Sequence, residues 1–355
     1  MPTPFASVLI DTYNHERFIE QAIVSVLEQD FAGGEREIIV VDDGSTDRTA
    51  ELVGKFAGQV RYLRKQNGGQ ASAFNAGIAA CRGEIVAFLD GDDWWARAKL
   101  KSVAETMERE PSVGIVGHGI VVVGRDTSEQ AESLREGFHF QANTVEGAKL
   151  FRRRGAFLGT SRMTIRAELL KCIGAIPEAI TIQADEYLFT VAAALSQVSI
   201  LPDTLTYYRM HSGNRFQLEE GSGAEALRNK QRSLATLAAT LETRLAELGV
   251  GQRVRRTILA YTRASAKQLR LLLDGGWPWE TVETEWTLYR VVHPEARWLH
   301  RVFKALQMMG ALAMPPRRFY GVQRGLAEKG WYRRARRRWL PVPQMEHIAH
   351  ERREK

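Results

Sequence analysis

Three aspartates in one short turn, Asp90, Asp92 and Asp93, are the residues of this sequence best suited to chemistry. They follow residues 85–89, an unbroken apolar run typical of a parallel strand covered on both faces. Carboxylates crowded together repel one another, whereas divalent cations such as Mg²⁺ prefer oxygen ligands and keep positions open for phosphate. The turn therefore predicts a metal and phosphate site, although alone it is equally typical of a surface turn.

Two further apolar runs also end in polar turns. Residues 7–10 lead into Asp11, and residues 38–41 lead into Asp42 and Asp43. The spacing of apolar residues predicts helices over 16–29 and 47–56, the second of them capped by Ser45 or Thr46. Strands that alternate with helices form a parallel sheet with right-handed crossovers. All three turns should therefore lie on one edge of a sheet, which is where open α/β folds bind ligands.

The residues from 5 to about 215 resemble family 2 of the inverting, nucleotide-sugar-dependent glycosyltransferases. Six segments match in the family's order: 7–14 (SVLIDTYN), 40–47 (VVDDGSTD), 67–77 (NGGQASAFNAG), 83–93 (GEIVAFLDGDD), 184–188 (ADEYL) and 201–211 (LPDTLTYYRMH). The resemblance implies an α/β protein of the GT-A fold, with a Rossmann-like, mostly parallel sheet flanked by helices. We expect the catalytic domain over residues 1–220. A mainly α-helical region should follow over 221–355, basic from about residue 297, with a membrane-surface or acceptor-binding role.

The resemblance also implies which residues bind the donor, a nucleotide-diphosphate sugar. Tyr13 should stack on the base, and Asp42 should accept a hydrogen bond from a uracil ring, so a UDP-sugar is expected. Asp11 stands where the family usually has Pro, which leaves the identity of the base open. Asp43 is assigned mainly to helix capping. The full expected set is Asp11, Thr12, Tyr13, Asn14, Asp42, Gln70, Asn75, Asp90, Gly91 and Asp92.

A bound Mn²⁺ or Mg²⁺ is implied at the aspartate turn, where it would stabilise charge on the leaving diphosphate. Asp92 is expected to bind the ion. Asp90 is expected either to contact the ribose or to support the ligands of the ion without binding it directly. Asp93 fits either role. His211 lies where the family often brings a His towards the metal or the diphosphate, and a purely structural role for it is equally compatible with the sequence.

Asp185 is the expected general base, which takes the proton from the acceptor hydroxyl as it attacks the sugar. The family usually has an acidic residue before this Asp, whereas this chain has Ala184 before it and Glu186 after it, so Glu186 is the alternative base. The Gln-X-X-Arg-Trp motif of processive synthases is absent from the sequence. We therefore expect transfer of one sugar to a hydroxyl acceptor in polysaccharide, glycolipid or glycoprotein assembly. A catalytically silent nucleotide-sugar binding or scaffold protein is the alternative.

Composition suits a cytoplasmic protein. The 355 residues include only two cysteines, Cys81 and Cys172, so a disulfide framework is not expected. No segment approaches the roughly 18 uninterrupted apolar residues of a membrane span. The N-terminus has no basic stretch followed by an apolar one, so no signal peptide is expected.

The positive charge is concentrated at the C-terminal end. The chain has a net charge of +7, but residues 297–355 hold 15 Lys and Arg against four Asp and Glu. Apolar residues recur at helical spacing from Trp298 to Leu312, and residues 331–340 combine Trp and Tyr with five Arg. Such a region fits anionic lipid headgroups, but it also fits a helix packed on the domain or, less well, nucleic acid. We expect a peripheral protein on the inner face of the cell membrane.

Overall fold

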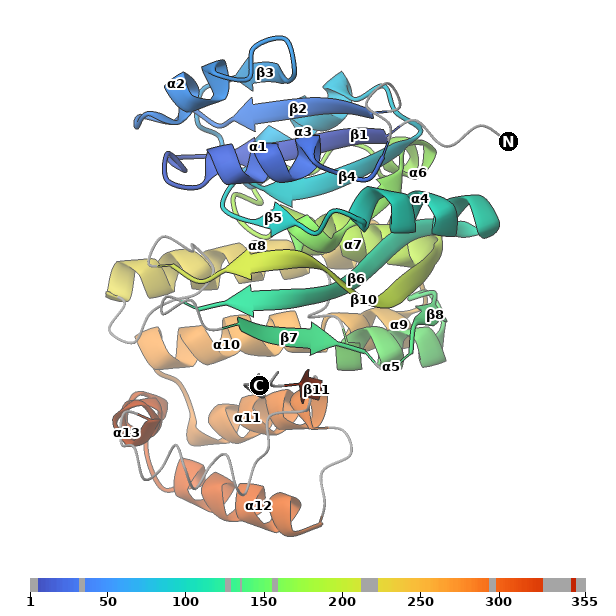
Figure 1. Ribbon diagram of the computed structural model, residues 1–355. Helices are drawn as coiled ribbons and strands as arrows, with labels where there is room; N and C mark the ends of the chain where they lie inside the picture. The colour runs from blue at the N-terminus through green and yellow to red at the C-terminus, as the bar shows by residue number, and fades with distance from the viewer. Residues whose placement is uncertain are drawn as a thin grey trace, which may run out of the picture.

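The computed structural model describes most of the chain, namely residues 6–31, 36–124, 129–134, 136–154, 159–211, 223–293, 298–327 and 346–348. It consists of a sheet with helices on both faces and a stack of helices at the C-terminal end (Figure 1). This arrangement confirms the predicted α/β class and the helical C-terminal region.

Four strands form the parallel half of the sheet, in the order β3-β2-β1-β4. Their bounds are β1 (Ala6–Thr12), β2 (Arg36–Asp42), β3 (Arg61–Arg64) and β4 (Ile85–Asp90). The crossover helices are α1 (Ile19–Leu27), α2 (Thr49–Gly54) and α3 (Gln70–Ala80). Thr12 lies opposite Asp42, and Asp11 lies opposite Asp90. The three polar turns therefore do meet on one edge of the sheet.

The other half of the sheet is mixed. Strand β9 (Thr164–Arg166) joins β4 to β6 (Val113–Val123) with antiparallel pairing, and β10 (Gln197–Arg209) pairs with β6 in parallel. The remaining strands are short, and they are β5 (Trp94–Trp95), β7 (Glu129–Ser133), β8 (Phe138–Phe140) and β11 (Glu346–Ile348). Because β10 pairs with β5 directly after the aspartate turn, it brings the 201–211 segment to the same edge.

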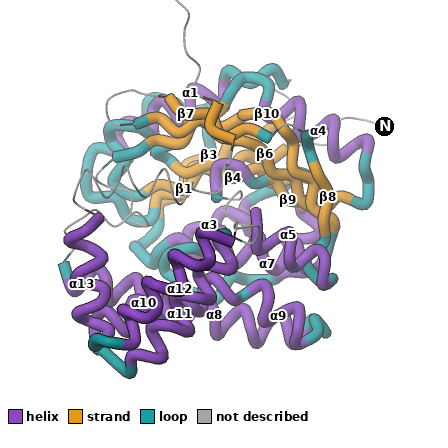
Figure 2. Tube along the Cα trace, turned by 90° about the horizontal axis from the view of Figure 1, so that it is seen from below, coloured by secondary structure: helices purple, strands orange, loops and turns teal. Residues whose placement is uncertain are grey.

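The two faces of the parallel strands are buried by different helices. Val8 and Ile10 of β1 pack with α1, α2 and α4 (Lys99–Arg109), whereas Leu9 packs into the larger core on the opposite face. That larger core is built on α3, α6 (Ala167–Ile173), α7 (Ala184–Leu195), α8 (Ala224–Glu247) and α9 (Gln252–Ile258). Helix α5 (Val145–Arg154) lies beside them (Figure 2). Burial on both faces explains the unbroken apolar runs of the sequence.

The helices after residue 220 share this core. Leu237, Leu241 and Leu245 of α8 are buried in one cluster with Leu9 of β1 and Leu188 of α7. The expected boundary at residue 220 stays a prediction, since α8 and α9 help to bury the catalytic half. The later helices are α10 (Ala260–Asp274), α11 (Pro278–Val292), α12 (Trp298–Leu312) and α13 (Pro316–Ala327).

Helices α10 to α13 have a small core of their own. Leu271, Met308, Ala311, Phe319 and Tyr320 are buried together there. A buried ion pair fastens α12 to α11, with Lys304 Nζ 2.8 Å from Glu285 Oε2. Among the residues described, no helix has the length and apolar character needed to cross a bilayer.

Two details of the sequence prediction are wrong. Helices α1 and α2 are shorter at both ends than the expected 16–29 and 47–56. Neither Ser45 nor Thr46 caps α2. The N-cap residue is Arg48, which makes no side-chain capping bond, and Asp47 before it accepts hydrogen bonds from the backbone N–H and the hydroxyl of Thr49, at 3.0 and 2.6 Å.

Candidate active site at the carboxyl edge of the sheet

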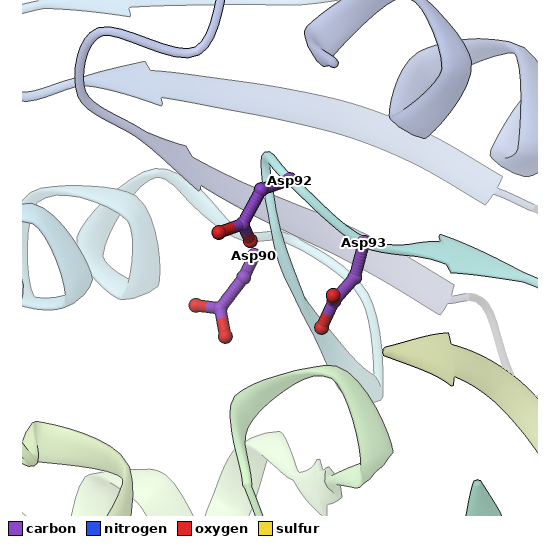
Figure 3. A group of neighbouring side chains, drawn as sticks. All are labelled: Asp90, Asp92 and Asp93. Atoms are coloured by element: carbon purple, nitrogen blue, oxygen red, sulfur yellow. The ribbon is translucent and has the colours of Figure 1, made fainter. Parts of the chain in front are cut away.

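The aspartate turn carries a tight group of carboxylates. Asp90 is the last residue of β4, and Asp92 and Asp93 follow in the turn to β5. The three side chains offer oxygen atoms that all lie within 4.8 Å of one another. Figure 3 shows the carboxylates of Asp90 and Asp92 on the same side of the turn. Like charges at such separations disfavour the fully ionised state, and a divalent cation would remove that cost.

A fourth carboxyl group, that of Asp11, adds to the crowding. Burial raises the pKa of Asp11 to about 7, and a hydrogen bond with Asp90 opposes this shift. The pKa of Asp90 is raised well above its usual range by burial and then by the charges of Asp11 and Asp92. One buried oxygen of Asp11, Oδ1, has no hydrogen-bond partner in the described part of the chain. Burial and mutual repulsion thus hold the pKa values of both Asp11 and Asp90 above their usual range.

Asp92 lies between two histidines. Its Oδ2 is 2.9 Å from His211 Nε2 and 3.8 Å from His15 Nε2. Burial acts to raise the pKa of Asp92, but the His211 hydrogen bond and the His15 charge outweigh it, so the pKa is lowered. The pKa of Asp92 is therefore shifted down, whereas the pKa values of Asp90 and Asp93 are shifted up. The structure brings His211 to the turn, and its contact with a metal ion or a diphosphate stays a prediction.

Asp93 is bound by protein groups at both oxygens. Ser161 Oγ donates to Oδ2 at 2.6 Å, and the backbone N–H of Arg209 donates to Oδ1 at 2.9 Å. Ser161 Oγ also accepts the backbone N–H of Asp90 at 3.1 Å. Burial and the charge of Asp92 raise the pKa of Asp93 well above its usual range. These bonds fix the shape of the turn, so Asp90 and Asp92 are better placed than Asp93 to receive a ligand.

Helix α7 presents its two acidic residues to different partners. Burial raises the pKa of Asp185, whose charge in turn raises the pKa values of Asp11 and Asp90. Glu186 is bound elsewhere, by Thr262 Oγ1 of α10 at 2.7 Å and Gln183 Nε2 at 2.9 Å. Burial raises the pKa of Glu186 to about 7. The charge of Asp185 thus acts on the carboxylate cluster, whereas Glu186 is bound by Thr262 and Gln183.

The residues expected to bind the nucleotide base lie in two loops that hydrogen bonds join to each other. Asn14 donates its backbone N–H to Ser45 Oγ at 2.9 Å, and its Oδ1 accepts the backbone N–H of Thr46 at 2.8 Å. Asp42 is fully buried and accepts hydrogen bonds from Ser45 N at 2.7 Å and Tyr62 Oη at 2.5 Å. Tyr13 is half-buried beside them. Contact of Asp42 and Tyr13 with a base stays a prediction.

Three other polar residues fix the backbone of segments near the site. Gln70 accepts the backbone N–H of Ala184 at 3.0 Å, which fastens the start of α7, and Asn75 bonds both backbone polar groups of Ile176 at 2.8 Å. The capping role assigned to Asp43 is wrong. Its carboxylate accepts hydrogen bonds from the backbone N–H groups of Gly68 and Gly69 and forms an ion pair with Lys65. Asp43 therefore shapes the 65–69 loop instead.

Sequence reasoning missed His15, Ser161 and Thr262. Ser161 contacts the aspartate turn and Thr262 contacts Glu186, each from a distant segment, and neither stands in a motif. His15 follows directly after Tyr13 and Asn14, just beyond the strand that carries Asp11, and this position was the signal that could have found it.

Comparison with known proteins gives a consistent result. Residues 7–174 match the family model of glycosyl transferase family 2. An uncharacterised glycosyltransferase of a Nostoc species, alr2836, is 32% identical over 254 residues, which cover 70% of this chain and 78% of the relative. The poly(ribitol-phosphate) β-N-acetylglucosaminyltransferase TarS of Staphylococcus aureus is 29% identical over 57% of this chain, but this covers only 35% of TarS.

Two solved structures have the same fold. TarS residues 1–349 of S. aureus, solved with UDP, match at a TM-score of 0.50 with 21% identity, over 81% of this chain and 89% of that one. The mannosyltransferase PcManGT of Pyrobaculum calidifontis, solved with GDP-Man and Mn²⁺, matches at a TM-score of 0.52 with 21% identity, over 94% and 83%.

Replacing Asp11 by Asn should stabilise the metal-free protein, and more so at pH 8 than at pH 5. The folded protein holds the Asp11 proton up to about pH 7, whereas the unfolded chain releases it near its ordinary value of 3.8. The carboxyl therefore costs stability increasingly as pH rises between these values. We expect a gain of about 1–3 kcal/mol at pH 8, measured by urea unfolding in chelator.

The matched control is Asp203→Asn, which changes an exposed aspartate of β10. It should alter stability little at either pH. If Asp11→Asn were neutral or destabilising at pH 8, the crowding of Asp11 against Asp90 would be refuted.

Proposed function

The chain belongs to glycosyltransferase family 2, and we propose that it transfers a single sugar, with inversion, from a UDP-sugar to a hydroxyl acceptor. The acceptor would be a growing polysaccharide, a glycolipid or a glycoprotein glycan. The observation that carries the proposal is the meeting of Asp11, Asp90 and Asp92 at the carboxyl edge of the sheet, with the charge of Asp185 acting on Asp11 and Asp90. TarS was solved with UDP and with UDP-GlcNAc, which supports the uridine nucleotide.

The carboxylates suit a divalent cation, Mn²⁺ or Mg²⁺. The three aspartate oxygens within 4.8 Å are donors of the kind that hard cations prefer, and the raised pKa values of Asp11 and Asp90 reflect a surplus of negative charge. Asp92 would hold the ion together with Asp90 and His211. The ion's part would be to neutralise charge on the leaving diphosphate. PcManGT was solved with Mn²⁺, which supports this assignment.

Asp185 would act as the general base. Its burial raises its pKa, and a base with a raised pKa is a better proton acceptor. The backbone N–H of Glu186 and groups of Thr160 bond its carboxylate and fix its direction. Gln70 holds the first turn of the same helix. The role of Glu186 would be structural, because its two oxygens join α7 to α10 through Thr262 and to Gln183.

The assignment predicts that Asp185→Asn keeps nucleotide binding but slows sugar transfer by about 10²-fold or more, the usual worth of a positioned base. Glu186→Gln should be much milder. The rate is read as nucleoside diphosphate released from whichever sugar a panel of UDP-sugars selects, and binding of UDP is measured by calorimetry. The reverse order of the two variants would make Glu186 the base. Binding without any release by the native protein would instead favour a silent sugar-nucleotide binding protein.

We also propose that the enzyme works on the cytoplasmic face of a membrane and rests on its surface. The predicted Arg cluster at 331–340 lies outside the described residues, but α12 is described. Six of its large apolar side chains are exposed by 44–70% of their surface, which is unusual for a protein surrounded only by water. They are Trp298, Val302, Phe303, Leu306, Met309 and Leu312.

These side chains form one outward face of α12. At about 100° per residue, five of them fall within an arc of roughly 120°, and Phe303 borders it. The opposite side of the helix carries Lys304, Met308 and Ala311, which are buried against α11 and α13. Exposed Arg301, Arg317 and Arg318 lie nearby on α12 and α13. An apolar face bordered by cations is the pattern of a helix that lies in an anionic lipid interface.

The double substitution Leu306→Glu with Met309→Glu should abolish flotation with anionic vesicles, because it puts two charges into the lipid-facing arc. The native protein should float with phosphatidylglycerol vesicles and detach as salt is raised. Val24→Glu on α1, another exposed apolar position, is the control and should leave flotation intact. The membrane role would be refuted if the double variant floated like the native protein. It would also be refuted if the native protein floated with neither neutral nor anionic vesicles.

A further inference from the structure

Helix α4 begins with a lysine that lies entirely inside the protein. Lys99 is 0% exposed, and its Nζ has no hydrogen-bond partner in the described part of the chain. The amine lies over the ring of Trp95, 3.3 Å from the centroid, which attracts an ammonium ion but does not balance its charge. Burial lowers the pKa of Lys99 well below its usual range. A buried ammonium group without a counter-charge is costly, so packing alone does not explain this lysine.

A buried histidine lies close to this lysine. His118 of β6 is fully buried, and the charge of Lys99 acts, after burial itself, to lower its pKa. Its Nδ1 is 2.9 Å from the carbonyl oxygen of Gly119. A carbonyl oxygen only accepts hydrogen bonds, so Nδ1 is the nitrogen that carries the proton of the neutral ring. The other nitrogen, Nε2, is buried and has no hydrogen-bond partner among the residues described, which leaves it available to a ligand.

A buried hydroxyl faces the same layer, between the sheet and α4. Thr164 of β9 lies opposite Val116 of β6, so both side chains point to one face of the sheet, and His118, two residues further along β6, points there too. Val116 packs with Val103 of α4, which identifies this face. Thr164 is fully buried, and its Oγ1 has no hydrogen-bond partner in the structure as described. Three buried polar groups that bond no protein atom thus belong to one layer.

Hydrogen bonds tie the surroundings of Lys99 and His118 together. The indole of Trp95 donates its Nε1–H to the carbonyl oxygen of Ser161 at 2.9 Å. The next residue, Arg162, donates its Nε–H to the carbonyl oxygen of His118 at 2.8 Å. The charge of Arg162 also lowers the pKa of His118, as that of Lys99 does. These side chains bring positive charge into the layer and no negative charge of their own.

We propose that Lys99, His118 and Thr164 bind a small monovalent anion, such as chloride, inside the folded protein. The anion would accept hydrogen bonds from Lys99 Nζ and Thr164 Oγ1, and from His118 Nε2 once that ring is protonated. A water molecule would satisfy the same hydrogen bonds but would leave the ammonium charge unbalanced. Full burial of all three side chains favours a halide over a larger oxyanion. The inference is independent of the proposed sugar transfer.

The first test measures thermal stability as chloride replaces gluconate at constant ionic strength, since gluconate is too large for a fully enclosed site. Chloride at ten times its dissociation constant should raise the Tm of the native protein by about 2 °C, and the rise should saturate. Lys99→Met keeps the length of the side chain but removes the amine, so it should lose this dependence on chloride. Lys101→Met is the matched control, because Lys101 is exposed on the same helix, and it should retain the dependence.

Two further measurements keep the test decisive if Lys99→Met fails to fold. Thr164→Val removes one hydrogen bond to the anion with little change of shape and should weaken chloride binding by about tenfold. Crystals grown with bromide in place of chloride should show an anomalous bromine peak within hydrogen-bonding distance of Lys99 Nζ. Equal Tm of the native protein in chloride and gluconate would overturn the inference even if a peak appeared, because the peak would then show binding at crystal concentration only. A chloride response kept in full by Lys99→Met would place the anion elsewhere and would also overturn it.

Discussion

Repulsion among carboxylates at one edge of a sheet is the constraint on which the rest of this structure depends. Asp11 and Asp90 lie opposite each other in neighbouring parallel strands, and Asp92 and Asp93 follow within three residues. Among the described residues, Arg209 is near enough for its charge to lower the pKa of Asp93, but it does not cancel the repulsion. Burial and mutual charge leave Asp11, Asp90 and Asp93 with raised pKa values. Such an arrangement costs stability, and a positively charged ligand would offset that cost.

The surrounding structure serves to keep the carboxylates in place despite this repulsion. Ser161 joins Asp90 to Asp93, and Arg209 bonds the backbone oxygen of Asp92 at 3.0 Å as well as Asp93. Asp185 arrives from the opposite side on α7, whose first turn is held by Gln70 and, through Glu186, by α10. The helical region after residue 220 therefore supports the site as well as offering the exposed face of α12.

The strand ends were predictable because they are local. Unbroken apolar runs that stop at aspartates indicate both the buried strands and their functional edge, and the six matching segments indicate the family. What could not be predicted depends on contacts between distant residues. Ser161 meets Asp93 across 68 positions of sequence, and Glu186 meets Thr262 across 76. The helical spacing from Trp298 to Leu312 likewise predicts a helix, but spacing alone does not tell which apolar residues are covered. In the structure Met308 is buried and Met309 is exposed.

The most direct test of the carboxylate site is calorimetric titration of UDP into the native protein, once with Mn²⁺ and once with excess chelator. If the crowded carboxylates need a cation to accept a diphosphate, UDP should bind with Mn²⁺ and bind at least about tenfold more weakly without it. Asp92→Asn should lose most of that difference while remaining folded. Equal affinity for UDP with and without the metal would contradict the account, because the diphosphate would then be bound without any cation to offset the aspartates.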